Sequence, residues 1–423
     1  MKKEIREDSR NYVATIVKIK EILPIEGADK IGVTYINGNP VIVQKDLDTS
    51  KLFVYFTALT ELSNTLCRAT NSYTKAEMNE DPTKRGFIEP NRRVKIIKLK
   101  GTYSNGMILP ISFFPQGLQE GDEFNSIDGV EYCKKYTIPA NMQSEGNNKK
   151  KDKAKKQESR LIEGQFQFHI DTSHLAKNLH QIKPNTVIEV SEKLHGSSAI
   201  IGNVLTKRKL TFLEKLAKYF GVEIKETEYD IIYSSRKVIK NSAKESGYYN
   251  EDIWKVVKDD VGHLIPKGVT LYGEIIGYTK SGQAIQKKYD YGCKNAEHKF
   301  VVYRITTTNE DGVVLEWSPI QIEEFCDKRG LLFSEYFIFY GRARDLIGYE
   351  DERDFGEKFL QFCVENYTEM DCSFCYNKVP REGVVVRVDS GEEYKAFKLK
   401  SQRFILGENK AQEEGETNME DEQ

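Results

Sequence analysis

The sequence VSEKLHGSS, residues 190–198, places Lys193 three residues before Gly196. This spacing alone means little, because Lys-x-x-Gly occurs by chance in many chains. It gains weight because four further segments follow in a fixed order, each joining charged or glycine residues to a short apolar run. They are SSR (234–236), LYGE (271–274), REGVVV (381–386) and AFKLK (396–400). Together they predict one site assembled from distant parts of the chain.

The chemistry of this predicted site centres on Lys193. A lysine with its ordinary pKa of about 10.4 is mostly protonated at neutral pH and is a poor nucleophile. Nearby positive charge or a metal ion favours the neutral amine, which can attack phosphorus. Lys398 and Lys400 are one residue apart on an expected strand, so both point to one face. If that face lies near Lys193, they supply the charge and can hold phosphate oxygens.

Two carboxylates and one guanidinium complete the set. Glu274 and Glu382 each adjoin a glycine at an expected strand, which lets a ligand approach the backbone. A carboxylate can accept ribose hydroxyls or hold a hydrated divalent cation. Arg236 offers a fixed fork of donors for a sugar hydroxyl or a phosphate. Taken singly, Arg236 equally fits a surface residue and Lys400 a structural ion pair, so the prediction depends on the joint order.

That order resembles the covalent nucleotidyltransferases, namely the polynucleotide ligases and mRNA capping enzymes. Within this group the chain resembles most the ATP-dependent RNA ligases that carry an N-terminal OB domain (the Deinococcus/Naegleria type), over nearly its whole length. The resemblance implies a nucleophile and phosphate-binding set made of Lys193, Glu382, Lys398 and Lys400. It further implies a nucleotide-binding set made of Glu192, Gly196, Arg236, Glu274, Tyr303 and Phe300.

Individual roles follow from the same resemblance. Lys193 would carry AMP, and Glu192 would help to read adenine. Glu382 would organise Mg²⁺ or Mn²⁺, with Glu274 as a second contact through water. Tyr303, with Phe300 as the alternative, would stack on adenine, and at most one of them does so because they lie on opposite strand faces. Many family members have aspartate where this chain has His195, so a metal-water contact at that position is in doubt.

The implied function is ATP-dependent sealing of RNA ends that bear a 3′-hydroxyl and a 5′-phosphate, in RNA repair. It would proceed through lysyl-AMP and RNA-adenylate, on nicked duplexes or other broken ends. The alternatives are a capping-type guanylyltransferase and a catalytically inactive nucleic-acid-binding protein. Capping enzymes and DNA ligases usually place an OB domain after the last lysine motif, whereas here only about two dozen residues follow Lys400. The domain order therefore favours the RNA ligase.

The chain is expected to have an α+β fold with four parts. Short β-branched and aromatic runs predict an OB-like β-barrel over residues 1–140. The segment LPIEGADKI (23–31) is similar to one in OB-type tRNA-binding modules, although a β-domain without a nucleic-acid role stays possible. The alternating run RVKIIKLK (93–100) predicts a strand with a basic face and a bulge at its double isoleucine. A basic flexible linker is expected at residues 141–160, a nucleotidyltransferase domain of antiparallel sheets with flanking helices at residues 161–407, and an acidic disordered tail at residues 408–423.

Bulk properties exclude several classes of protein. The 423 residues carry a net charge of −2, and no apolar run reaches transmembrane length. Seven scattered cysteines suit a reducing compartment better than a disulfide framework. Cys372 and Cys375 form one Cys-x-x-Cys without the second ligand pair that zinc needs. We therefore expect a soluble, cytoplasmic monomer with no membrane partner. The physiological RNA, the tolerance of DNA strands and the role of the cysteine pair are not determined by the sequence.

Overall fold

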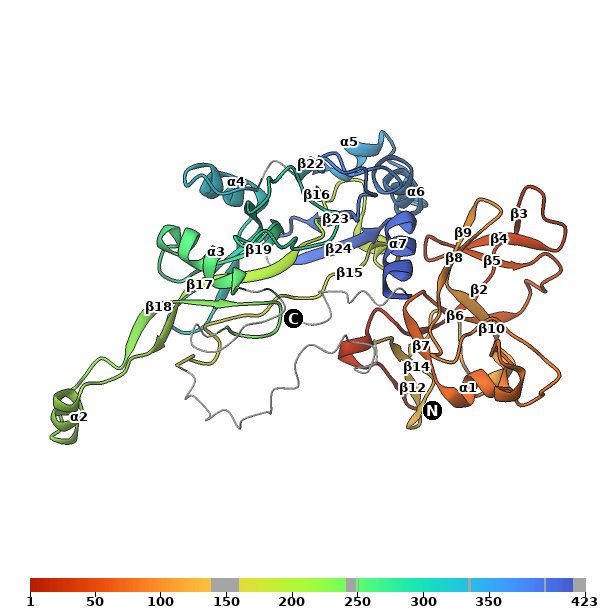
Figure 1. Ribbon diagram of the computed structural model, residues 1–423, viewed down its shortest axis with the longest axis horizontal. Helices are drawn as coiled ribbons and strands as arrows, with labels where there is room; N and C mark the ends of the chain where they lie inside the picture. Colours follow the sequence, from red (N-terminus) through yellow and green to blue (C-terminus); the bar gives the residue numbers. More distant parts are fainter. Residues whose placement is uncertain (138–159, 241–248, 250, 334–335, 392, 414–423) are drawn as a thin grey trace. The chain divides into compact units, whose positions relative to one another are not determined.

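The computed structural model (Figure 1) describes residues 1–137, 160–240, 249, 251–333, 336–391 and 393–413. The chain divides into two compact units. The first contains Met1–Gly146 together with Ser401–Thr417, and the second contains Asn147–Lys400. The expected linker at residues 141–160 lies outside the described residues except for Arg160. Within the described part of the chain, none of the helices has the length and hydropathy that a membrane crossing requires.

The first unit is built from short antiparallel strands, as its β-branched and aromatic runs predict. A four-stranded sheet has the order β10-β6-β2-β11, and smaller sheets surround it. The strands are β1 (Lys3–Glu4), β2 (Ala14–Lys18), β3 (Leu23–Pro24), β4 (Ile31–Ile36), β5 (Asn39–Gln44), β6 (Leu52–Phe56), β7 (Thr60–Leu62), β8 (Ile96–Leu99), β9 (Thr102–Asn105), β10 (Met107–Pro110), β11 (Glu123–Phe124), β12 (Ser126–Ile127), β13 (Val130–Glu131) and β14 (Cys133–Lys135), with one short helix, α1 (Asn64–Ala69).

The basic strand β8 differs from its prediction. It begins only at Ile96 and pairs with β9 without a register shift, so the expected bulge is wrong. Ile96 is buried, but Ile97 and Leu99 are exposed. β8 and β9 form a two-stranded ribbon, and α7 (Gln402–Glu413) and β5 contact it while Ile97 and Leu99 stay exposed.

The acidic tail also differs from its prediction, because its start is helical. Helix α7 (Gln402–Glu413) follows Lys400 after one residue and belongs to the first unit. The buried Arg93 guanidinium donates to the side-chain oxygen of Asn409, and Lys95 Nζ lies 2.8 Å from a carboxylate oxygen of Glu413. The boundary expected at residue 407 and the disorder expected from Glu408 are therefore wrong up to Glu413; residues 414–423 lie outside the described part.

The α7 contact yields a first testable prediction. Asn409→Ala removes the acceptor of a buried guanidinium N–H, which should lower the free energy of unfolding of the first unit by about 1–3 kcal/mol. Chemical denaturation monitored by tyrosine fluorescence measures this change. The exposed neighbour Lys410→Ala is the control and should change it by less than about 0.5 kcal/mol. Equal effects of both variants would mean that α7 is not anchored through Arg93.

The second unit contains two five-stranded sheets. The first sheet has the order β15-β24-β23-β16-β22 and the second has the order β18-β17-β19-β20-β21. The only parallel pair in these two sheets is β15 with β24. Their strands are β15 (Ser173–His174), β16 (Val187–Glu192), β17 (Ser197–Lys207), β18 (Thr227–Ser234), β19 (Val269–Gly277), β20 (His298–Thr308), β21 (Val314–Glu316), β22 (Phe337–Arg342), β23 (Gly383–Val388) and β24 (Lys395–Lys400).

Each sheet of the second unit has its own core, closed by its own helices. Helices α5 (Ala343–Ile347) and α6 (Phe355–Cys363) pack on the first sheet. Helices α3 (Ile253–Val261) and α4 (Pro319–Asp327) pack on the second sheet. This confirms the expected α+β class with antiparallel sheets and flanking helices.

Helix α2 (Phe212–Tyr219) lies apart from both cores. The helical spacing of apolar residues in TFLEKLAKYF (211–220) predicts a helix here, and it forms, with Thr211 capping it through a capping box with Glu214. It sits at the end of the long β17–β18 ribbon, away from the sheets (Figure 1), and buries none of its residues. Phe212 and Tyr219 are 79% and 84% exposed. The apolar spacing that usually indicates a core-facing helix here produces an exposed apolar face.

Candidate functional site

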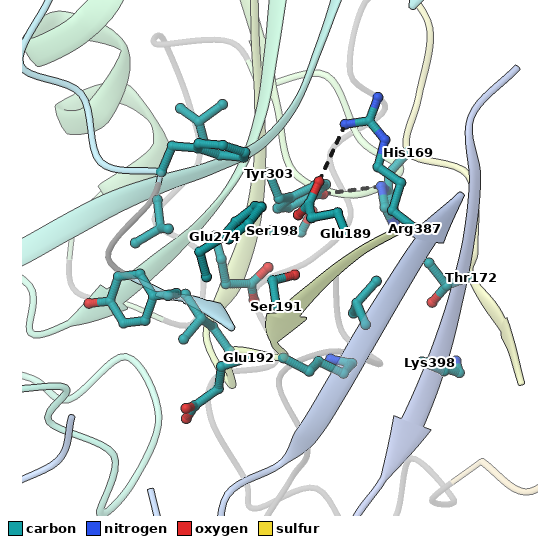
Figure 2. A pocket seen from close by; sticks show the side chains of 18 of the residues that line it. His169, Thr172, Glu189, Ser191, Glu192, Ser198, Glu274, Tyr303, Arg387 and Lys398 are labelled. Carbon is teal, nitrogen blue, oxygen red and sulfur yellow. Dashed lines mark hydrogen bonds and ion pairs between the residues drawn. The ribbon is translucent and has the colours of Figure 1, made fainter. Parts of the chain in front are cut away.

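A pocket lies between the inner faces of the two sheets of the second unit (Figure 2). Strand alternation creates it, because successive side chains of a strand point to opposite faces. On β16, Ile188 and Val190 enter the core while Glu189 and Ser191 line the pocket. β23 and β24 repeat this alternation, whereas β20 lines the pocket with three successive residues, Val301, Val302 and Tyr303. Their pocket-facing residues include Ser198 (β17), Glu274 (β19), Tyr303 (β20), Val385 and Arg387 (β23), and Lys398 and Lys400 (β24).

The predicted nucleophile Lys193 lies at the edge of this pocket, directly after β16. Its Nζ is 2.7 Å from Oε1 of Glu382, and Nζ of Lys400 is 2.9 Å from the same oxygen. The Glu382 side chain is fully buried, whereas the two lysine side chains keep 18% and 16% exposure. Two ammonium groups thus converge on one carboxylate oxygen, which brings two like charges close together.

Backbone pairing explains how these three residues meet. The Lys193 amide donates to the Gly383 carbonyl at 2.9 Å, which continues the pairing of β16 with β23. Gly383 faces Lys400 across the β23–β24 ladder, and its φ is +148°. A Cβ there would lie 2.0 Å from the Leu399 carbonyl oxygen, so only glycine allows this close approach.

His195 is close to the same carboxylate without bonding to it. Its Nδ1 is 3.8 Å from Oε2 of Glu382, which is too far for a hydrogen bond. Its backbone N–H donates to the buried Tyr291 hydroxyl at 2.6 Å, and its ring meets Tyr289 edge-on. Contacts with Tyr289 and Tyr291 therefore hold His195 in a defined position beside Glu382.

Glu192 lines the pocket, and its carboxylate is held by residues outside the lining. Arg381 Nε lies 2.9 Å from one oxygen and the Cys372 thiol lies 3.2 Å from the other. Burial, with the neighbouring thiol as a second cause, raises the pKa of Glu192 to about 8. Sequence reasoning did not assign Arg381 a role, although it directly precedes Glu382 in the quoted segment.

Of the two aromatic residues predicted to stack on adenine, Tyr303 lines the pocket, whereas Phe300 packs in the core of the second sheet. Phe333, Tyr336, Phe337 and Tyr394 also line the pocket. A register shift in the β19–β20 pair leaves Tyr303 as an extra residue between the partners Val302 and Arg304. Its hydroxyl bonds with Nδ1 of His169 at 3.1 Å, as Figure 2 shows. The structure thus offers Tyr303, and not Phe300, to a bound molecule.

The remaining predicted residues have varied positions. Glu274 and Arg236 line the pocket, and Arg236 forms an ion pair with Asp171. Lys398 lines the pocket on the same face of β24 as Lys400. Gly196 is not among the lining residues described. A Cβ there would lie 2.3 Å from the Ile275 carbonyl oxygen, so this glycine permits close packing of β19 and does not face a ligand.

Sequence reasoning missed a buried ion pair on the pocket wall. Arg387 Nη1 lies 3.9 Å from a carboxylate oxygen of Glu189, and the Arg387 guanidinium lies over the Tyr394 ring, 5.3 Å from its centroid. Figure 2 shows Glu189 and Arg387 pointing toward one another. Burial raises the pKa of Glu189 to about 7. The sequence feature that could have indicated this ion pair is a charged residue within each of two apolar strands, Glu189 in β16 and Arg387 in β23.

The raised pKa of Glu189 predicts a pH dependence of stability. The carboxyl ionises near its ordinary pKa of 4.5 in the unfolded chain and near 7 in the folded protein. Between these values the folded state keeps a proton that the unfolded state has lost, so raising the pH favours unfolding. The contribution from Glu189 is present below about pH 4.5 and is lost, on the order of 3 kcal/mol, as the pH rises through 7.

Urea denaturation at a series of pH values between 4.5 and 8 measures this dependence. Glu189→Gln has no carboxyl group to titrate, so its free energy of unfolding should decline less steeply with pH than that of the unaltered protein. The exposed Glu323→Gln serves as the control and should keep the original slope. Identical slopes in all three proteins would show that Glu189 is already ionised at low pH.

The described residues fit a divalent metal that one or two carboxylates hold together with water and nucleotide phosphates. Among the described residues, no group of three or more His, Cys, Asp or Glu side chains has an arrangement suited to a metal ion. Glu382 and Glu274 are separate carboxylates of one site. This donor set fits Mg²⁺ or Mn²⁺ bound by one or two carboxylates, with water and nucleotide phosphates as the other ligands.

Comparisons with known proteins agree with this geometry. A family described as RNA ligase matches residues 186–400, which is half of the chain, and an OB-fold domain family matches residues 13–111. The chain therefore belongs to the RNA ligase family, and its N-terminal part is an OB-fold domain. No curated protein matches the sequence.

Several solved structures share the fold. A lysine-to-methionine variant of the Naegleria gruberi RNA ligase with AMP and Mn is 18% identical, with a TM-score of 0.58, and the match covers 93% of this chain and 98% of that one. The same ligase with PPi is 18% identical, with a TM-score of 0.56 and coverages of 96% and 100%. A glutamate-to-alanine variant of the same ligase with ATP and Mn is 18% identical, with a TM-score of 0.56, and the match covers 93% of this chain and 98% of that one. The fold is thus shared over almost the full length of both chains.

Proposed function

We propose that this protein is an ATP-dependent ligase that seals RNA ends through a lysyl-AMP intermediate on Lys193 and serves RNA repair. The observation that carries the proposal is the convergence of Lys193 and Lys400 on Glu382 at the edge of the pocket. The family membership supports ligation of RNA. The Naegleria gruberi ligase structures with ATP, AMP and Mn support the choice of nucleotide and metal.

In the first step Lys193 Nζ attacks the α-phosphorus of ATP and pyrophosphate leaves. The amine must first lose a proton, and Oε1 of Glu382 is the nearest acceptor at 2.7 Å. The charge of Lys400 beside it favours the neutral form of Lys193. Lys398 and Lys400, on one face of β24, are positioned to hold the α-phosphate oxygens as negative charge develops on them.

The other pocket residues bind the nucleotide. Tyr303 offers its ring to adenine from the β20 bulge, and its hydroxyl bond to His169 fixes the ring orientation. Arg236 and Glu274 contact the ribose or groups near it. Glu382 and Glu274 would hold Mg²⁺ or Mn²⁺ together with water and the phosphates, and the ion supplies charge stabilisation at the phosphates. Glu192 would help to read adenine, with Arg381 and Cys372 fixing its carboxyl group.

Two further transfers complete the reaction. The AMP moves from Lys193 to the 5′-phosphate of an RNA end, and a 3′-hydroxyl then attacks that end and expels AMP. The N-terminal OB-fold domain is a fold that commonly binds nucleic acid, and we propose that it binds the RNA beside the break. The substrate is a nicked duplex or another pair of broken ends, and the protein acts as a monomer in the cytoplasm.

The test is incubation of purified protein with α-labelled ATP or, separately, α-labelled GTP, with magnesium or manganese, followed by a denaturing gel. We expect an acid-labile, hydroxylamine-sensitive label from ATP. Adding 5′-phosphorylated nicked RNA should then remove the label from the protein and yield a sealed strand. Label from GTP alone would indicate capping chemistry, and no label from either nucleotide would indicate a binding protein without catalysis.

A further inference from the structure

The loop that precedes β23 connects two cysteines to the candidate site. It is closed at its base by two backbone hydrogen bonds, from the Cys372 amide to the Val379 carbonyl at 2.8 Å and from the Arg381 amide to the Met370 carbonyl at 2.9 Å. The chain then continues directly into Glu382. A covalent change in this loop therefore acts next to the residues that contact Glu192 and Lys193.

The two thiols of this loop are neighbours with different access to solvent. Cys372 and Cys375 lie close enough for each sulfur to shift the pKa of the other. Cys372 is buried, whereas Cys375 is partly exposed, and the other five of the seven cysteines are buried. Cys375 is thus the thiol that a reagent in solution reaches first. With no metal-binding group of three side chains among the described residues, the pair has no visible use as a zinc site.

The surroundings divide the roles of the two sulfurs. The Tyr291 amide N–H donates to the Cys375 sulfur at 3.4 Å. The neighbouring Cys372 thiol holds the pKa of Cys375 below its usual value. The neighbouring Cys375 sulfur and burial raise the pKa of Cys372. Because the thiolate is the reactive form, Cys375 is suited to attack an oxidant and Cys372 to resolve the product.

Contacts on both sides tie this pair to the nucleophile. Cys372 Sγ lies 3.2 Å from Oε1 of Glu192, the residue before Lys193. Tyr291, which donates to Cys375, accepts the His195 amide through its hydroxyl at 2.6 Å. The thiols therefore contact supports of the nucleophile loop both before and after Lys193.

A carboxylate fixes the loop against the segment that contains Tyr291. Asp290 accepts the amide N–H groups of Tyr376 at 2.8 Å and Asn377 at 3.1 Å, directly after Cys375, and that of Gly292 at 2.9 Å. The loop is thus held on a rigid base, and a change at the sulfurs cannot be absorbed by free movement of the whole loop.

We propose that Cys372 and Cys375 are an oxidisable dithiol whose disulfide slows the adenylylation of Lys193. The inference rests on the proposed function for its effect on catalysis, but the formation of the disulfide does not depend on that function. The oxidant is a peroxide small enough to reach Cys375.

The chemistry balances in two steps. The Cys375 thiolate attacks one oxygen of the peroxide, the O–O bond breaks, and with one proton taken up the products are Cys375 sulfenic acid and water or an alcohol. The Cys372 sulfur then attacks the sulfenic sulfur, forming the S–S bond, and its proton leaves with the hydroxyl as water. Two thiols are oxidised by two electrons and one peroxide is reduced. The disulfide no longer offers an S–H to Glu192.

The experiment compares reduced and peroxide-treated full-length protein. Intact mass should fall by two hydrogen atoms after treatment, and peptide mapping should join Cys372 to Cys375. The rate of Lys193 labelling from ATP should fall about tenfold, the effect of losing one well-placed hydrogen bond, and dithiothreitol should restore it. Cys375→Ser is the matched control and should label at an unchanged rate with or without peroxide. Cys372→Ala, which lacks the donor, should label slowly even when reduced, while Cys372→Ser should label faster than Cys372→Ala.

The outcomes separate the two proposals. If peroxide forms no link between Cys372 and Cys375, or if the linked protein labels at the reduced rate, the dithiol proposal is overturned. If the reduced protein gives no label at all, the proposed function fails. ATP affinity measured by equilibrium dialysis on both forms still reports on the pocket in that case, and unchanged affinity after disulfide formation would then overturn the dithiol proposal.

Discussion

Lys193→Met is expected to lose ATP-dependent labelling by at least about a thousandfold, because no other group takes the place of a missing nucleophile. Methionine keeps the length and most of the volume of lysine. Lys400 stays 2.9 Å from Glu382, so the pocket edge should remain folded. The thermal unfolding midpoint should move by no more than about 3 °C. Labelling is read on a denaturing gel and unfolding by scanning calorimetry.

Two companion variants give this prediction its specificity. Lys193→Arg keeps the positive charge beside Glu382 but carries a guanidinium that stays protonated, so it too should give no label. Lys209→Met alters an exposed lysine before α2 and should label normally. A label that persists in Lys193→Met would assign the nucleophile to another lysine of the pocket, with Lys398 and Lys400 as the candidates.

Glu382→Gln is expected to reduce both stability and labelling, which distinguishes it from Lys193→Met. The fully buried carboxylate is shared by Lys193 and Lys400, and breaking a buried ion pair costs about 3–5 kcal/mol. The lower end of that range applies, because both lysine side chains are still partly open to water. Labelling should fall at least about a hundredfold, since the proton acceptor and the proposed metal contact are both lost.

A double variant tests the cause of the instability. Removing one of the two converging charges in Glu382→Gln/Lys400→Met should recover part of the lost free energy of unfolding without restoring the label. Glu324→Gln, which alters an exposed i,i+4 pair with Lys328, should cost less than about 0.5 kcal/mol. If Glu382→Gln proves as stable as the unaltered protein, the carboxylate does not balance the two lysines in solution.

Much of the fold was readable because local patterns and tertiary packing agree. β6 forms at Leu52–Phe56 as predicted, and the strand alternation of Val384–Val388 correctly separates core from pocket. The failures occur where the surroundings decide. Nothing local in RVKIIKLK indicates that β8 belongs to a two-stranded ribbon on which Ile97 and Leu99 stay exposed. Nothing local in α2 indicates that its apolar face has no partner within the described part of this chain.

The sequence also predicted the central residues of the candidate site. The residues that it did not predict are positioned by the pairing of distant strands. The order of charged segments allowed Lys193, Glu382 and Lys400 to be grouped, and the structure places them in contact. The choice between Tyr303 and Phe300 follows from a register shift that no single strand encodes. The pairing of Glu189 with Arg387 depends on the antiparallel register of β16 and β23, which aligns two residues about two hundred positions apart.

The return of α7 to the first unit has a consequence for how the protein is made. The OB-fold unit lacks Asn409, the partner of its buried Arg93, until the ligase unit has been synthesised. At about 5–20 residues per second, the ribosome needs on the order of tens of seconds to pass from Gly146 to Gln402. During that interval the nascent first unit is an incomplete domain on a growing chain. Its final consolidation therefore waits until the ligase unit has been translated.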